Sequence, residues 1–233
     1  MKNSALNARL LSAAELTRQN ATFADIGTDH AYLPLFLLDE GRICRAICSD
    51  INEGPLASAR KNAEERGLSD KIDFVLTDGA AALSDMGATD YAICGMGGEL
   101  IAEIIRSAPY LKNSDLNLIL QPMSRQAYLR KFLAREGFLI KKESYSFDAG
   151  KYYVCLQTVY DGVCREIDEI EAEIGSSDAE FLGQDARVGY VKNLLNARRR
   201  AAGGKKLGGI ENIPEEKVIE ALESLLSALE ERK

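Results

Sequence analysis

One stretch near the N-terminus combines an acidic turn with a glycine and the only histidine of the chain. It reads Asp25-Ile26-Gly27-Thr28-Asp29-His30 and lies between a short apolar run and a predicted helix. Parallel α/β proteins bind nucleotides at such turns, at the carboxyl ends of their strands. Asp29 lies where the pyrophosphate of a dinucleotide would approach, and its carboxylate would repel that group. The turn therefore predicts a ligand that carries a cation and no phosphate, although an ordinary βα turn is the simpler interpretation.

Acids and glycines also follow the next three predicted strands. Asp50 can accept hydrogen bonds from both hydroxyls of a ribose, and Asp78-Gly79 can contact an adenine base. S-adenosylmethionine carries a ribose, an ammonium and a sulfonium, and it has no phosphate. The charges therefore favour this cofactor over NAD. Each motif alone is weak, because strand-end acids and Asp-Gly turns are common.

Gly95-Met96-Gly97-Gly98 follows the fourth predicted strand, which faces the methyl acceptor in a methyltransferase fold. Enzymes that methylate exocyclic amines often carry an Asn/Asp-Pro-Pro-aromatic motif here, and this chain has glycines instead. A ring nitrogen with its own lone pair is therefore the easier acceptor. His30 could orient the cofactor or contact the substrate. We expect no metal site, because the sequence shows no set of partner ligands for His30.

Strands and helices alternate through the first two thirds of the chain, which predicts a mostly parallel sheet with helices on both faces. The segment between the last two strands, 147–151, is too short for a crossover, so these strands must be antiparallel neighbours. A Rossmann-like sheet that ends in a hairpin is the architecture of class I methyltransferases. The predicted strands are 22–26, 45–50, 72–76, 91–94, 116–120, 138–146 and 152–160, and the predicted helices are 6–16, 32–40, 52–66, 99–107 and 125–136.

The composition changes after Asp161, where apolar residues recur at helical spacing. We expect two domains, a methyltransferase domain over 1–160 and a small helical appendage over 161–233 with an antiparallel, coiled-coil-like pair. The middle segment, 178–202, is predicted to be helical, and a glycine-rich loop over 203–209 is expected to separate it from the last helix.

The cysteine content, the length of the apolar runs and the composition predict a cytoplasmic globular protein. The five cysteines include no C-x-x-C pair, so they indicate reduced thiols, and no apolar run is long enough to span a bilayer. The net charge of −7 argues mildly against nucleic acid. Two basic groups nevertheless predict a phosphate-contacting face, with solvated helix faces as the alternative. They comprise Arg187, Lys192, Arg198, Arg199, Arg200, Lys205 and Lys206, and Arg125, Arg130, Lys131, Arg135, Lys141 and Lys142.

Taken together, these motifs resemble the bacterial tRNA (adenine(22)-N1)-methyltransferase family (TrmK) over roughly residues 5–160. The matching segments are D-I-G-T-D-H-A-Y-L-P at 25–34, D-I-N-x-G-P-L at 50–56, Asp78-Gly79, G-M-G-G at 95–98, L-I-L-Q-P-M at 118–123, and L-R-x-x-L…G-F…E…G-K-x-Y over 129–153. The resemblance implies a class I methyltransferase fold with a C-terminal coiled coil. It also implies transfer of a methyl group from S-adenosylmethionine to N1 of adenine 22 in the D-arm of tRNA.

On this hypothesis Asp29 is the catalytic residue, because it could hydrogen-bond the N6 amine and stabilise the cationic product ring. The expected cofactor-binding residues are Gly27, Asp29, His30, Asp50, Ile51, Asn52, Asp78, Gly79, Gly95 and Met96. The expected substrate-binding residues are Arg9, Met96, Pro122, Met123, Arg198, Arg199 and Arg200. We expect a monomer that binds no membrane. The second hypothesis is an S-adenosylmethionine-dependent methyltransferase with a small-molecule acceptor. The third hypothesis is a non-catalytic binding protein.

Overall fold

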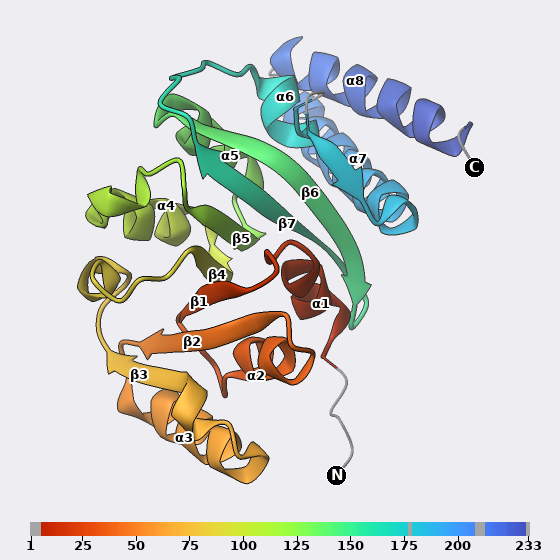
Figure 1. The fold of residues 1–233 in the computed structure, drawn as a ribbon. Coiled ribbons are helices and arrows are strands. Elements are labelled where there is room, and N and C mark those ends of the chain that lie inside the picture. The colour runs from red at the N-terminus through yellow and green to blue at the C-terminus, as the bar shows by residue number, and fades with distance from the viewer. Residues whose placement is uncertain (1–5, 177–178, 208–212, 232–233) are drawn as a thin grey trace.

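The computed structural model describes residues 6–176, 179–207 and 213–231 and is built around one twisted sheet (Figure 1). Its strands are β1 (Ala21–Ile26), β2 (Ile43–Asp50), β3 (Ile72–Leu76), β4 (Asp90–Gly97), β5 (Asn117–Ser124), β6 (Phe138–Asp148), β7 (Lys151–Tyr160) and β8 (Glu180–Leu182). Its helices are α1 (Ala8–Glu15), α2 (Tyr32–Asp39), α3 (Glu53–Arg66), α4 (Gly98–Ser107), α5 (Gln126–Arg135), α6 (Glu169–Ile174), α7 (Gln184–Leu207) and α8 (Ile213–Glu230).

The strand order is β3-β2-β1-β4-β5-β7-β6-β8. Strands β1 to β5 are parallel, and β7 pairs antiparallel with both β5 and β6. The order reverses between β1 and β4, which makes their carboxyl ends the switch point where open α/β sheets bind ligands. The prediction of a Rossmann-like sheet with a terminal antiparallel hairpin is confirmed.

Two apolar clusters cover the two faces of the sheet. One joins α1, α2 and α3 to side chains such as Phe23 and Ala46, and the other joins α4 and α5 to side chains such as Ile26 and Ile93. Alternate residues of one strand enter opposite clusters, because side chains along a strand point alternately to its two faces. Both faces are therefore closed by helices, and the polar strand ends remain at the edge.

The appendage differs from the prediction in one element. Residues 180–182, expected to be helical, form β8, which pairs in parallel with β6 at the edge of the sheet. A short strand between two helices leaves no helical periodicity, so backbone pairing with β6 decides its conformation. Helix α7 also continues to Leu207, past the expected break at Gly203, whereas Gly208 and Gly209 lie outside the described residues.

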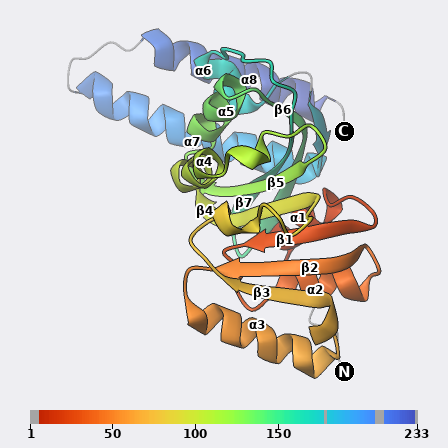
Figure 2. The ribbon, with the colours of Figure 1, turned by 60° about the vertical axis from the view of Figure 1, so that its left-hand side comes forward.

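The expected antiparallel helical pair is formed by α7 and α8, at the end of the sheet opposite α3 (Figure 2). Val191 and Leu195 of α7 are buried with Val218 and Leu222 of α8. Two ion pairs along the seam, Lys192–Glu230 and Arg199–Glu223, join residues whose numbers rise on one helix and fall on the other. The division at residue 160 stays a prediction, and β8 joins the later segment to the sheet.

Candidate cofactor and acceptor site

The turn after β1 is tied to β2 by its backbone. The amides of Gly27 and Thr28 both donate to the carbonyl of Ser49, each at 2.8 Å. Gly27 has φ +73°, and a Cβ there would lie 2.1 Å from the terminal methyl of Met96. The left-handed backbone favours glycine, and a side chain there would also have to displace the Met96 methyl, which ends a flexible side chain. The turn therefore brings Met96 of β4 against Gly27, as the shared strand-end position of both residues predicts.

His30 and Ala31 continue the turn with left-handed backbone, at φ 59° and 54°. Non-glycine residues rarely adopt this conformation, which costs roughly 1–3 kcal/mol each, so surrounding contacts must hold it. The side-chain amide of Asn62 in α3 donates to the carbonyl of His30 at 2.9 Å. The imidazole Nε2 lies 3.2 Å from the carboxylate of Asp29, whose side chain is 80% exposed. Asp29 and His30 thus form one polar pair at the open edge of the sheet.

Asp25 lies beneath this turn, and its position in the sequence does not make it stand out from other strand acids. It is buried, and the hydroxyl of Thr28 donates to its carboxylate at 2.6 Å. Burial raises the pKa of Asp25 to about 6, the Thr28 hydrogen bond opposes this, and the negative charge of Asp50 adds to the rise. A cationic ligand at the turn would favour the ionised form of Asp25.

Asp50 ends β2 beside the turn. Its Oδ1 accepts the backbone N–H of Asn52 at 2.7 Å, which fixes the carboxylate at the strand end. Its register partner in β3 is Leu76, and both Leu76 and Ile51 expose apolar side chains. An acid with apolar neighbours on both sides suits a ribose that carries a flat base.

Asp78 and Gly79 follow β3 on the same edge of the sheet. Asp78 is exposed, and Gly79 has φ +62° and packs on Ile104 of α4. The structure therefore places the predicted cofactor residues at the carboxyl ends of β1, β2, β3 and β4, as the strand order requires.

Near the carboxyl end of β4, the buried side-chain amide of Gln121 in β5 links this strand end to α1. Sequence reasoning did not single out Gln121. Gln121 Oε1 accepts from Arg9 Nη1 at 2.7 Å and from the backbone N–H of Gly95 at 3.0 Å. Gly95 has φ +80°, and a Cβ there would lie 3.4 Å from Arg9 Nη1. Pro122 is buried beside this cluster, and Met123 is exposed. No signal in the sequence pairs Arg9 with Gln121, because the contact joins residues far apart along the chain.

The charges at this edge test the predicted cofactor. Residues 25–31 contain two acids and no Lys or Arg, and Asp50 and Asp78 add two further carboxylates at adjacent strand ends. Such an edge repels phosphate and attracts ammonium and sulfonium groups. The residues present therefore fit S-adenosylmethionine, and they do not fit a pyrophosphate.

Comparison with known proteins agrees with this geometry. Residues 6–156 match the family model described as a methyltransferase domain. The chain is also 32% identical, over 197 residues, to the tRNA (adenine(22)-N(1))-methyltransferase of Bacillus subtilis (strain 168). This match spans 84% of this chain and 77% of that protein. The chain belongs to the tRNA (adenine(22)-N1)-methyltransferase family. The family and the enzyme class predicted from the sequence motifs are thus confirmed.

Solved structures extend the likeness to nearly the whole chain. A Streptococcus pneumoniae candidate tRNA (m1A22) methyltransferase, solved with S-adenosyl-L-methionine, has 31% identity and a TM-score of 0.78, over 94% of this chain and 98% of that one. Mycoplasma capricolum TrmK, solved with S-adenosyl-homocysteine, has 26% identity and a TM-score of 0.73, over 96% and 99% of the two chains. The match therefore includes the helical appendage of this family member.

Several members of the two basic groups of this methyltransferase family member are buried or paired with acids within the protein, so fewer cations remain for the predicted phosphate-contacting face. Arg130 and Arg187 are buried. Arg198 pairs with Glu173 and Glu215, and it is half-buried. Further ion pairs join Arg125 to Glu99, Lys131 to Glu169, Lys142 to Glu180 and Lys192 to Glu230. Helical spacing cannot separate a solvated cation from one that faces an acid on another element.

Arg199 and Arg200 are the exposed members of the arginine triplet. Arg199 pairs with Glu223 at the surface of the helical pair, and Arg200 follows it on α7. An exposed ion pair contributes only about 0–1 kcal/mol, so Arg199 can exchange its partner for a phosphate with little loss of stability. The side chains of Lys205 and Lys206 lie outside the described residues.

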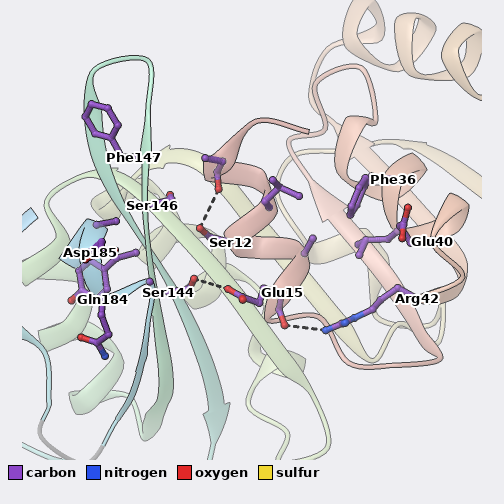
Figure 3. A pocket seen from close by; sticks show the side chains of 17 residues that line it. Ser12, Glu15, Phe36, Glu40, Arg42, Ser144, Ser146, Phe147, Gln184 and Asp185 are labelled. Atoms are coloured by element: carbon purple, nitrogen blue, oxygen red, sulfur yellow. Dashed lines mark hydrogen bonds between the residues drawn. The ribbon is translucent and has the colours of Figure 1, made fainter. Parts of the chain in front are cut away.

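A cavity of about 800 Å³ in this methyltransferase fold lies away from the carboxyl edge (Figure 3). Residues of α1, of the β6–β7 hairpin and of the end of α2 line it, and Ser12, Phe36 and Phe147 are among them. None of the predicted site residues lines it. This cavity is therefore separate from the strand ends that carry the acids.

Three further observations concern the described part of the chain. It contains no group of three or more His, Cys, Asp or Glu side chains placed to hold a metal ion. Its helices are too short or too polar to cross a membrane. Its cysteines are free thiols, with Cys48 and Cys155 buried, Cys94 half-buried, and Cys44 and Cys164 exposed.

Proposed function

We propose that this protein transfers a methyl group from S-adenosylmethionine to N1 of adenine 22 in tRNA. The observation that carries the proposal is the row of acids at the carboxyl ends of neighbouring parallel strands, in a chain that belongs to the tRNA (adenine(22)-N1)-methyltransferase family. S-adenosylmethionine supplies the electrophilic methyl group when it is bound. The residues of this chain position the cofactor and the base.

In this proposal Asp50 accepts the ribose hydroxyls, while Ile51 and Asn52 lie at the start of the same turn. Asp78 and Gly79 receive the adenine of the cofactor, and the turn residues Gly27, Asp29 and His30 receive its methionine end, with Gly95 and Met96 closing the pocket. The support is positional, because all these residues lie at four adjacent strand ends. The opposite charges of the turn and of the ammonium group favour the same orientation.

The transfer itself needs alignment more than a strong base, because adenine N1 is an adequate nucleophile once it is unpaired. N1 lies on the Watson–Crick edge, so the target base must leave the RNA helix to react. We propose that Met96, Pro122 and Met123 bound the base pocket. Asp29, exposed at the mouth of the turn, would accept a hydrogen bond from the N6 amine and offset the positive charge of the product ring.

Methylation of unmodified tRNA tests this function. Purified protein and labelled S-adenosylmethionine should yield N1-methyladenosine, identified by nucleoside mass spectrometry, because the pocket presents a ring nitrogen to the methyl carbon. Changing adenine 22 to guanine should abolish the product. A protein that binds the cofactor and methylates no RNA would contradict the proposal and favour a small-molecule acceptor. A protein that does not bind S-adenosylmethionine at all would point to a non-catalytic binding module.

We further propose that Arg199 and Arg200, with Arg9 near the pocket, contact the tRNA backbone. The double substitution Arg199→Glu/Arg200→Glu should raise the KM for tRNA by on the order of 10-fold, since reversed charges repel phosphates. The Kd for S-adenosylmethionine, measured by calorimetry, should not change. Lys61→Glu/Lys71→Glu, which reverses two exposed lysines at the opposite end of the sheet, is the matched control. Equal effects of the two pairs would contradict a tRNA surface on α7.

We also infer that the protein acts as a monomer in the cytoplasm, where its tRNA substrate is found. The apolar faces of α7 and α8 support the monomer, because they are buried against each other within one chain. A dimer mass in light scattering would contradict this inference.

A further inference from the structure

Gln121 carries a fully buried side-chain amide in the second half of β5, next to the proposed base pocket. The oxygen end and the nitrogen end of this amide have different hydrogen-bond partners. Arg9 Nη1 and the backbone N–H of Gly95 both point at one end of the amide, at 2.7 and 3.0 Å. Both groups are donors, so the amide end that faces them must be the oxygen. The NH₂ group of Gln121 therefore has to face the other way.

The contacts of that NH₂ group are weak for a buried donor. It lies 3.3 Å from the carbonyl of Pro122, the next residue along the chain, and 3.6 Å from the sulfur of Met123. A thioether is a poor acceptor, and the carbonyl of Pro122 also accepts from Gln126 at 3.3 Å. Buried polar groups normally have good partners, so the two long contacts of this donor call for an explanation, and a ligand with a better acceptor would supply one.

The side chain of Met123, a residue that is 44% exposed, covers the amide. Methionine is unbranched and has three rotatable bonds, so its sulfur can leave the amide without movement of the backbone. The sulfur thus takes the place of a better acceptor, and a flat base that enters between Met96 and Met123 could supply one.

We propose that Gln121 is a specificity-determining residue that donates a hydrogen bond from Nε2 to an acceptor nitrogen of the target adenine. This proposal rests on the proposed function. N1 must face the methyl group, so the acceptor is N7 or N3. Arg9 is a positioning residue in this arrangement, because its hydrogen bond to Oε1 prevents the amide from turning over.

Gln121→Glu is the sharpest test, because a carboxylate keeps the acceptor for Arg9 and Gly95 and removes both N–H donors. The kcat/KM for tRNA should fall roughly 10- to 100-fold, as expected for one lost hydrogen bond in a buried site. The Kd for S-adenosylmethionine should stay unchanged. Gln126→Glu is the matched control, since Gln126 also donates to Pro122 but is half-buried on α5, and it should keep its activity.

Modified tRNAs decide whether the lost donor faces the base. Substrates with 7-deazaadenine or 3-deazaadenine at position 22 lack one acceptor each. One of them should lower the wild-type rate about as much as Gln121→Glu does, and the same substrate should lower the rate of the variant no further. The proposal would be overturned if the rate losses caused by Gln121→Glu and by each deaza substrate multiplied when combined. It would also be overturned if the wild-type enzyme methylated both deaza substrates at its full rate. Wild-type protein that leaves ordinary tRNA unmethylated would instead refute the proposed function, so the two failures are distinguishable.

Discussion

Replacing Asp25 by Asn is expected to stabilise the unliganded protein and to weaken its binding of the cofactor. The pKa of this buried carboxyl is raised from 3.8 to about 6, mainly by burial, so folding is opposed by the ionised group. One pKa unit corresponds to ~1.36 kcal/mol, which gives an upper estimate of about 3 kcal/mol at neutral pH. An amide of the same shape carries no such penalty and can still accept from Thr28. Urea denaturation of both proteins without cofactor measures the difference.

The stability difference between Asp25→Asn and the unsubstituted protein should depend on pH. Between 3.8 and about 6 the folded state binds more protons at Asp25 than the unfolded state does, so the contribution of Asp25 becomes more destabilising as pH rises through this range. The advantage of Asp25→Asn should therefore be full above pH ~6, about half as large near pH 5, and small near pH 4. A difference that is the same at all these pH values would contradict the assignment.

The cofactor measurement separates Asp25 from its neighbour Asp50. Asp25→Asn removes a negative charge beneath the turn and should weaken S-adenosylmethionine binding by roughly 10-fold or more. Asp50→Ala should weaken it by roughly 10- to 150-fold, the usual effect of lost charged hydrogen bonds, without the gain in stability, because Asp50 is only half-buried. Calorimetry checks both values. Wild-type affinity in Asp50→Ala would refute the ribose role.

Removing Arg130 is expected to have the largest effect on folding. This guanidinium is 1% exposed and donates to both carboxylate oxygens of Glu143, from Nε at 2.9 Å and Nη2 at 2.8 Å. Its Nη1 donates to the carbonyls of Ala172 and Glu173 at the end of α6. Arg130→Met would leave Glu143 buried without its cation and would free those carbonyls. The expected loss is about 3–5 kcal/mol in the free energy of unfolding, measured by urea denaturation.

Two further variants show what the pair itself contributes. Arg130→Met/Glu143→Leu removes both charges and should recover a large part of the loss, because apolar replacements of buried ion pairs are often tolerated. Arg135→Met, on the exposed side of the same helix, should change stability by less than about 0.5 kcal/mol. A loss of similar size in Arg130→Met and Arg135→Met would contradict a structural role for the buried pair. The Arg130 network also ties α6 to α5 and β6, so its loss should loosen the appendage.

Local patterns in the sequence determine the architecture and half of the site. Short apolar runs separated by helical periodicity define β1 to β5, and the brief segment before β7 forces an antiparallel pair. Acids and glycines directly after those runs define the cofactor edge, because parallel strands must end on the same side of a sheet. These are properties of neighbouring residues, which is why Gly27, Asp50 and Asp78 could be selected from the chain alone.

The tertiary structure decided which polar residues face inward and which distant residues meet. Arg130 is indistinguishable from Arg135 in a sequence, yet Glu143 and the end of α6 enclose it. Asp25 acquires its raised pKa only from the elements that bury it, and Glu180–Leu182 becomes a strand only because β6 offers a free edge. Arg9 and Gln121 meet because α1 packs across the ends of β4 and β5. Burial and long-range contacts depend on the whole folded chain, so no window of sequence contains them.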